Sequence, residues 1–272
     1  MSKKLLTIQD ISCYGQCSTT VALPVLSAYG IETAILPSAI LSTHTYGFTN
    51  YTVLDLTMEM PKILNHWTSE KITFDALYTG YISSKEQFDI IIDAKMSTLK
   101  LDGLFFVDPA MADHGKMYPG LDHTIVEGMR RLASDCDYII PNVTEACFLT
   151  ETPYSNTKTI EELTVIAKKL YSMGAKNVII TGLETEGKIG AIAYNGKNID
   201  YVLYPKCEKS YHGTGDLFSS MFIAQILNNA SITEALNKSC KFIIDAINQT
   251  VNDPSHSYGV KYEEILKKAF TD

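Results

Sequence analysis

Short runs of apolar residues alternate along the chain with longer segments of helical periodicity. Six of these runs have the length and composition of strands that are buried on both faces of a sheet. They cover residues 5–8, 33–36, 76–78, 104–107, 138–140 and 178–180. The runs therefore predict the strands of a central, mostly parallel sheet.

The segment 161–173 has the apolar spacing of an amphipathic helix. Thr159 and Glu162 predict a capping box at its start, in which each side chain accepts a hydrogen bond from the other residue's backbone. Gly174 suits the end of the helix, because glycine readily adopts the left-handed backbone found there.

A second helix is predicted over residues 88–99, with Ser83 and Glu86 as its capping box. Strands that alternate with helices predict right-handed βαβ units, in which helices cover both faces of the sheet. Residues 189–194 and 199–204 flank Asn195-Gly196, which predicts an antiparallel edge hairpin. No linker or repeat interrupts the sequence, so residues 1–272 are expected to form one α/β domain.

Charge and cysteine content exclude several functions. The net charge is -8, the pI is about 5.3 and no basic stripe occurs, so we expect no nucleic-acid partner. The six cysteines lack zinc-site spacing, and no apolar stretch is long enough for a signal peptide or a membrane span. A cytoplasmic protein with no membrane partner is the expectation.

In a parallel sheet, ligands bind outside the carboxyl ends of the strands, so the polar residues that follow the apolar runs are candidate site residues. The segment Gly213-Thr214-Gly215-Asp216 precedes a largely apolar helix. Its glycines can expose successive backbone amides to an anion, and Asp216 could accept a proton beside that anion. Taken alone, such a motif is more often a plain turn with an acidic first helical turn.

Four oxygen-bearing side chains follow two of the strands. Asp108 and Asp113 come after residues 104–107, and Asn142 and Glu145 come after residues 138–140. Such hard ligands suit Mg²⁺, usually through water. The alternatives are that Asp108 is a turn residue and that Asn142 and Glu145 form a capping box.

These motifs together resemble the ribokinase-like superfamily, and within it the pyridoxal (vitamin B6) kinases. The resemblance extends over nearly the whole chain. It rests on Asp10-Ile11-Ser12, Leu41-Ser42-Thr43-His44-Thr45, Thr79-Gly80-Tyr81, Asp108-Pro109 with Asp113, Pro141-Asn142-Val143-Thr144-Glu145 and Gly213-Thr214-Gly215-Asp216.

The resemblance implies a role for each site residue. Asp216 would be the catalytic base, and the amides of Gly213, Thr214 and Gly215 would hold the transferred phosphoryl group. The substrate would be bound by Ser12, His44, Thr45 and Tyr81. The metal would be bound by Asp108, Asp113 and Glu145. ATP would be bound by Asn142, Thr181 and Thr214.

The implied activity is phosphorylation of the 5-hydroxymethyl group of pyridoxal, pyridoxine or pyridoxamine by ATP with Mg²⁺. The resemblance also allows a monovalent cation such as K⁺ and implies a homodimer. Residues 13–17 and Tyr46 depart from better-known pyridoxal kinases, which leaves the preferred vitamer open. The alternatives are a hydroxymethylpyrimidine kinase, a sugar kinase and a B6-binding protein without catalysis.

Overall fold

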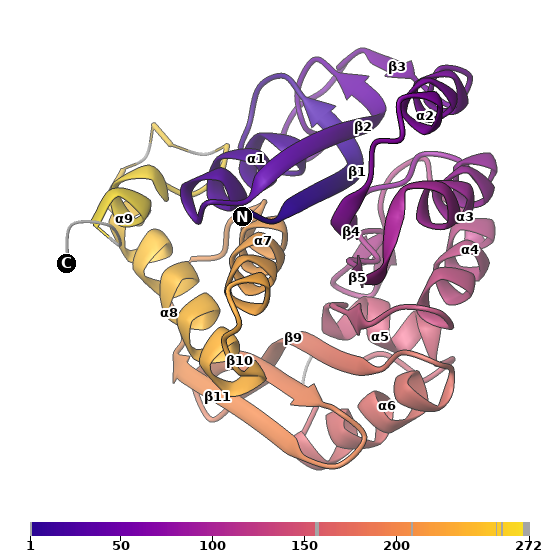
Figure 1. Cartoon of the computed structure of the whole chain (residues 1–272). Coiled ribbons are helices and arrows are strands. Elements are labelled where there is room, and N and C mark those ends of the chain that lie inside the picture. Colours follow the sequence, from indigo (N-terminus) through magenta and orange to yellow (C-terminus); the bar gives the residue numbers. More distant parts are fainter. Residues whose placement is uncertain (1, 156–157, 208, 254, 257, 269–272) are drawn as a thin grey trace.

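The computed structural model describes all residues except 1, 156–157, 208, 254, 257 and 269–272. Within these residues the centre is a nine-stranded sheet of order β11-β10-β9-β8-β5-β4-β1-β2-β3 (Figure 1). The parallel strands are β1 (Lys4–Ser12), β2 (Glu32–Leu41), β4 (Phe74–Thr79), β5 (Leu99–Val107), β8 (Tyr138–Ile139) and β9 (Asn177–Thr185). Each overlaps one of the predicted runs, so the parallel sheet is confirmed.

Antiparallel strands close both edges of the sheet. At one edge, β10 (Lys188–Tyr194) and β11 (Ile199–Pro205) form the predicted hairpin, with Gly196 at φ 86° in its turn. At the other edge, β3 (Val53–Asp55) pairs with β2, which the sequence pattern did not predict. A separate small hairpin consists of β6 (Ala112–Asp113) and β7 (Lys116–Met117).

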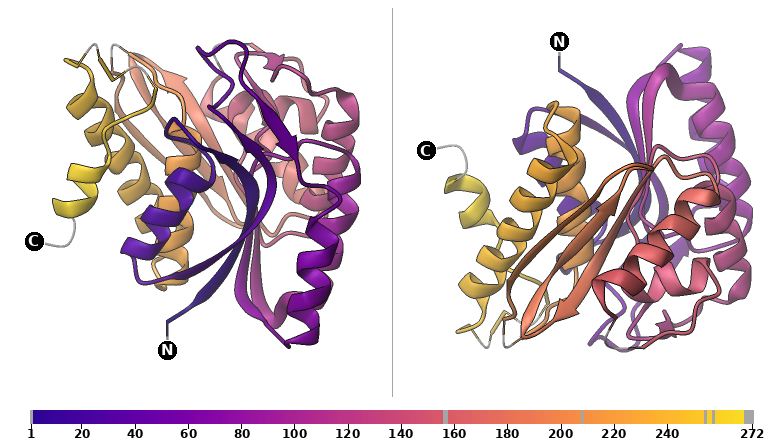
Figure 2. Two further views of the ribbon diagram at one scale, coloured as in Figure 1. Left: turned by 90° about the horizontal axis from the view of Figure 1, so that it is seen from above. Right: turned by 90° about the horizontal axis from the view of Figure 1, so that it is seen from below.

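Helices cover both faces of the sheet, as Figure 2 shows from two sides. The helices on one face are α2 (Met60–Ser69), α3 (Glu86–Thr98), α4 (His123–Ala133), α5 (Val143–Leu149) and α6 (Ile160–Ser172). Those on the other are α1 (Thr19–Ala28), α7 (Thr214–Leu227) and α8 (Ile232–Thr250), followed by α9 (Glu263–Lys268). In the described part of the chain, none of the helices is both long and apolar enough to span a bilayer.

Of the capping boxes predicted at Thr159 and at Ser83, only the first is present. The Thr159 hydroxyl accepts a hydrogen bond from the Glu162 amide at 3.2 Å, and the Glu162 carboxylate accepts one from the Thr159 amide at 2.8 Å. The box predicted at Ser83 is wrong, because Ser83 donates its hydroxyl to Asp55 at 2.8 Å and lies outside α3. A charged acceptor on a neighbouring segment outcompetes the local cap.

The carboxyl ends of neighbouring strands are joined by backbone hydrogen bonds beyond the regular ladders. The Gly80 amide donates to Ile8 at 3.1 Å, and the Asp108 amide donates to Thr79 at 2.9 Å. Farther along the same edge, the Thr181 amide donates to Pro141 at 2.9 Å. These bonds bring the loops that carry the predicted site residues to one edge of the sheet.

Candidate active site

The loop ahead of α7 has a backbone shape that only glycine fits. Gly213 has φ 76° and ψ -1°, in the left-handed region, and caps the N-terminus of α7. A Cβ atom at this position would lie 1.8 Å from the carbonyl oxygen of Gln16. The turn after β1 therefore packs directly against the start of α7. Because the first amides of a helix have no acceptor within it, this N-terminus can bind an anion.

Asp216 lies partly buried in the first turn of α7. Burial, with a smaller contribution from the charge of Asp10, raises the pKa of its carboxyl to about 6, against a hydrogen bond from the Ser18 backbone that lowers it. A carboxylate with this pKa is ionised at neutral pH and is still basic enough to receive a proton from a hydroxyl group during a reaction.

Asp108, at the end of β5, is tied to the same helix. It is buried, and the Ser219 hydroxyl donates to its carboxylate at 2.6 Å. Burial raises the pKa of Asp108 to about 8, and the charge of Asp216 contributes in the same direction. Because Ser219 lies three residues after Asp216, α7 positions both carboxylates. Ser219 was missed in the sequence, where it is one polar residue within an apolar helix.

The capping box predicted at Asn142 and Glu145 is present. Glu145 is buried and accepts hydrogen bonds from the backbone amides of Asn142, Met111 and Ala112 at 2.8, 3.1 and 3.4 Å. The Asn142 side chain accepts from the Glu145 amide at 2.9 Å and donates to the Ala112 carbonyl at 2.8 Å. Both polar ends of Asn142 thus hold the loop after β5 against α5, and its approach to ATP stays a prediction.

Tyr118 connects the carboxylates into one region. Burial raises its pKa well above the ordinary value, and four carboxylates add to the effect: Glu145, Asp113, Asp216 and Asp108, in decreasing order. All four carboxylates therefore lie within electrostatic range of its phenol. No sequence signal marked Tyr118 beyond its place shortly after Asp113.

Asp113 is the most open of these acids, with 46% of its side chain exposed, and it accepts a hydrogen bond from the His114 amide at 2.8 Å. Among the described residues, no three His, Cys, Asp or Glu side chains form a group that could hold a metal alone. This donor set fits Mg²⁺, which commonly keeps several waters and binds through one or two carboxylates and substrate phosphates.

A second group of polar side chains surrounds the end of β1. Asp10 and Ser12 are both buried, and the Ser12 hydroxyl donates to the Asp10 carboxylate at 2.8 Å. Burial, followed by the charge of Asp10, raises the pKa of Tyr81 to about 12. Burial and the charges of Asp216 and Asp10 raise that of the Cys17 thiol, so Cys17 lies between the two acids as a neutral thiol. Cys17 was not predicted as a site residue.

His44, on the loop after β2, closes this group. It is 6% exposed, and its Nε2 lies 3.2 Å from the Tyr258 carbonyl oxygen. Its Nδ1 is buried without a hydrogen-bond partner. A Cβ atom on Gly15 would lie 2.0 Å from the His44 ring, so the turn after β1 holds this ring in place.

The remaining predicted residues lie at the edges of the site. Thr45 follows His44 and is partly buried, and the next residue, Tyr46, stacks on His212 just ahead of Gly213. Thr181, within β9, lies beside Asn142, with which it forms an isolated parallel bridge. The proximity of Thr45 to the substrate and of Thr181 to ATP stays a prediction.

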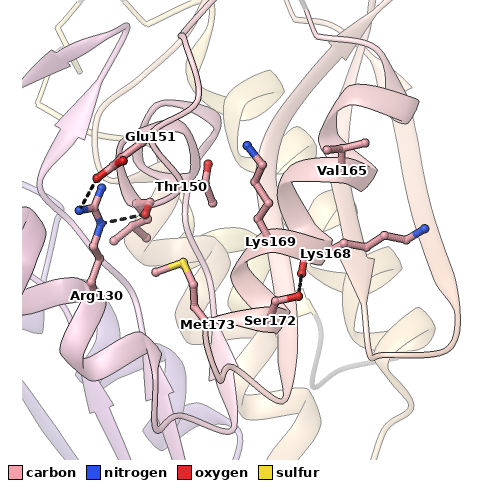
Figure 3. Close-up of a pocket in the computed structure, with 9 residues that line it drawn as sticks. Arg130, Thr150, Glu151, Val165, Lys168, Lys169, Ser172 and Met173 are labelled. Atoms are coloured by element: carbon pink, nitrogen blue, oxygen red, sulfur yellow. Dashed lines mark hydrogen bonds and ion pairs between the residues drawn. The ribbon is translucent and has the colours of Figure 1, made fainter.

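A surface hollow of about 630 Å³ lies apart from these residues, between α4, the end of α5 and α6 (Figure 3). Its Arg130 donates to the carbonyls of Leu149 and Phe148 at 2.9 and 2.8 Å and pairs with Glu151 at 3.0 Å. The arginine therefore fastens α4 to the end of α5. None of the predicted site residues lines this hollow.

Comparison with known proteins places the chain among kinases. A Bacteroides thetaiotaomicron protein provisionally assigned as a phosphomethylpyrimidine kinase, crystallised with pyridoxal, is 35% identical, with a TM-score of 0.93 over 98% of this chain and 96% of its own. Pyridoxal kinase from Lactobacillus plantarum is 30% identical, with a TM-score of 0.91 over 99% and 97%. Pyridoxal kinase from Dictyostelium discoideum is 27% identical over 97% of this chain and 93% of its own length.

These likenesses confirm the ribokinase-like fold and the resemblance to pyridoxal kinases that the motifs indicated. The sequence model of one family, described as phosphomethylpyrimidine kinase, matches residues 22–260. Since that match spans most of the chain, the protein belongs to the phosphomethylpyrimidine kinase family.

Proposed function

We propose that this chain transfers the γ-phosphoryl group of ATP to the 5-hydroxymethyl group of a vitamin B6 vitamer. The observation that carries the proposal is the start of α7, where an anion-binding N-terminus and the Asp216 carboxylate lie beside the buried Asp10 and Ser12. An attacking hydroxyl group and a phosphoryl group can meet there. The 35% identical Bacteroides protein was crystallised with pyridoxal.

In the proposed reaction, Asp216 accepts the proton of the hydroxymethyl group as its oxygen attacks the γ-phosphorus. The bond from the γ-phosphorus to the bridging oxygen breaks, and ADP leaves. The amides of Gly213, Thr214 and Gly215 stabilise the charge on the transferring group. Ser12, His44, Thr45 and Tyr81 would line the pyridine ring, an assignment supported by the shared environment of Ser12, His44 and Tyr81 around Asp10.

Asp113 and Glu145 would hold Mg²⁺ through water, with Asp108 near the metal or a monovalent cation such as K⁺. When bound, Mg²⁺ would neutralise phosphate charge. Asn142, Thr181 and Thr214 would approach the ATP phosphates.

We also propose that residues 1–272 act as one kinase domain and assemble as a homodimer. The support for a dimer is a set of exposed apolar side chains at the β2–β3 edge. Ile40, Val53, Leu54 and Met58 are 36, 54, 59 and 81% exposed. Apolar exposure at an open sheet edge is typical of an interaction surface.

Hydroxymethylpyrimidine is the second candidate substrate, because the family model that matches the chain is that of phosphomethylpyrimidine kinases. A binding protein without catalysis is disfavoured by the presence of Asp216 and the four-carboxylate region around Tyr118. A single assay separates these functions.

The assay offers pyridoxal, pyridoxine, pyridoxamine and hydroxymethylpyrimidine separately, each with Mg-ATP, and measures ADP and phosphorylated product. We expect product from at least one B6 vitamer, with a larger kcat/KM than for hydroxymethylpyrimidine. The reverse order would select the pyrimidine function. Binding of a vitamer without any product would select the non-catalytic one.

A further inference from the structure

The proposed reaction leaves one buried acid of the site without a role. Asp10 is only 3% exposed, and its carboxylate receives hydrogen bonds from the hydroxyls of Ser12 and Ser18. The ion pairs formed among the described residues do not include it. A buried carboxylate that lacks a cation is unfavourable, so its position in a substrate site points to a positive charge supplied by the ligand.

His44 gives a second, independent indication. Its Nε2 contacts the Tyr258 carbonyl oxygen, which can only accept, so Nε2 carries the proton of the neutral ring. Burial lowers the pKa of His44, which favours this neutral form. Nδ1 carries no proton in this form and makes no geometric hydrogen bond within the described chain, and the backbone of Tyr46 also acts on the ring and raises its pKa. His44 and Asp10 lie close enough for each to shift the pKa of the other. Two buried acceptors thus suit a ligand group that brings N–H or O–H donors.

Ser18 fixes where that group lies relative to the reacting hydroxyl. Its hydroxyl bonds to Asp10 and its backbone bonds to Asp216, so one residue holds both carboxylates. A substrate whose hydroxymethyl group rests on Asp216 would then bring a positive group on a neighbouring ring atom toward Asp10. In the B6 ring the position-4 substituent is adjacent to the hydroxymethyl group, whereas the ring nitrogen lies across the ring from position 4.

We propose that Asp10 and the Nδ1 atom of His44 bind an ammonium group at position 4 of the substrate and so select pyridoxamine over pyridoxal and pyridoxine. The inference rests on the proposed B6 kinase function. Pyridoxamine alone among these three vitamers carries a primary ammonium there. The aldehyde of pyridoxal is only an acceptor, and the alcohol of pyridoxine has one donor and no charge.

The test compares wild type with Asp10→Asn, which keeps the shape and removes the charge. We expect wild type to have a kcat/KM for pyridoxamine at least about tenfold above that for pyridoxine. In the variant, kcat/KM for pyridoxamine should fall about 10- to 100-fold, and that for pyridoxine less than about threefold. The control variant Asp75→Asn removes a carboxylate that pairs with Lys100 at the opposite end of the strands. It should leave kcat/KM for every vitamer unchanged.

Calorimetric titration with pyridoxamine and with pyridoxine, without ATP, gives the same comparison independently of turnover. If Asp10→Asn does not fold, as judged by thermal melting, Asp10→Ser takes its place. Equal losses of kcat/KM for all three vitamers would mean that Asp10 binds the ring nitrogen or has only a structural role, and would overturn the inference. A wild type with the same kcat/KM for all three vitamers would overturn it as well. A wild type that binds no vitamer would overturn the proposed function itself.

Discussion

Replacing Asp216 by asparagine tests the central assignment, because the change removes the charge and the basicity and keeps the side-chain shape. If Asp216 takes the proton of the attacking hydroxyl, kcat should fall about 10²- to 10⁴-fold, the usual contribution of a positioned general base. KM for the vitamer should change little, since the neighbouring Asp10, Ser12 and Tyr81 remain in place.

The magnitude of a second effect follows from the environment of this carboxyl. Its pKa is about 6 in the fold and 3.8 when exposed, so the folded state holds the proton more tightly. The fold therefore loses stability as pH rises from about 4 to about 6, and above that it carries a penalty of at most about 3 kcal/mol. Asp216→Asn has no such charge, so it should melt higher than wild type at pH 8 and at the same temperature at pH 3.5.

Two measurements check these expectations. The kcat/KM of wild type for the vitamer should rise with pH through about 6, with roughly a tenth of the plateau value at pH 5. That limb should be absent from the residual activity of the variant. Asp89→Asn, which removes an exposed acid from the first turn of α3, serves as the matched control and should stay within about twofold of wild type.

A variant that keeps the wild-type kcat would refute the base assignment. A variant with lowered kcat and a correspondingly lowered melting temperature at pH 8 would show damage to the fold, contrary to the electrostatic reasoning above.

Three further predictions concern other parts of the molecule. Asp113→Asn should raise the Mg²⁺ concentration for half-maximal activity at least about fivefold without lowering the melting temperature, and unchanged Mg²⁺ dependence would remove Asp113 from the metal site. Gly213→Ala should lower kcat more than about 100-fold, because its Cβ would meet the Gln16 carbonyl oxygen at 1.8 Å. The control Gly187→Ala has a similar φ of 73° but open space around its Cβ, so it should keep the full kcat. Equal kcat values in the two variants would contradict the close approach at Gly213. Leu54→Asp should convert a dimer to a monomer in light scattering, while Val165→Asp on α6, similarly exposed, should not; a wild-type monomer would exclude the β3 interface.

The sequence predicted the sheet well because its parallel strands are buried on both faces and so appear as continuous apolar runs. The strand β3 was not predicted, because it is short and exposed and its apolar residues show no periodic pattern. The strand ends located Asp108, Asn142 and Glu145 for the same reason, since Asp108 directly follows the run 104–107 and the other two lie shortly after the run 138–140.

The partners of these residues could not be predicted, because they come from distant segments. Ser219 has no distinguishing local sequence pattern. Its hydroxyl donates to Asp108 only because the fold brings α7 next to the end of β5. Asp10 and Asp216 become neighbours only through Ser18, which has no local signature of contact with either. The burial of Asp10 without a cation, which raises its pKa, is therefore a property of the tertiary structure alone.

The contact between Gly213 and the Gln16 carbonyl also bears on how the protein is made. Most of the polypeptide separates these two residues, and the site needs both of their loops. A ribosome-bound chain that has completed the first strands and helices still lacks the loop with the base, so it cannot turn over substrate. Contacts between residues so far apart in sequence also slow folding. The activity should therefore appear late during synthesis, and vitamer or nucleotide should protect the finished chain from proteolysis much better than any N-terminal fragment.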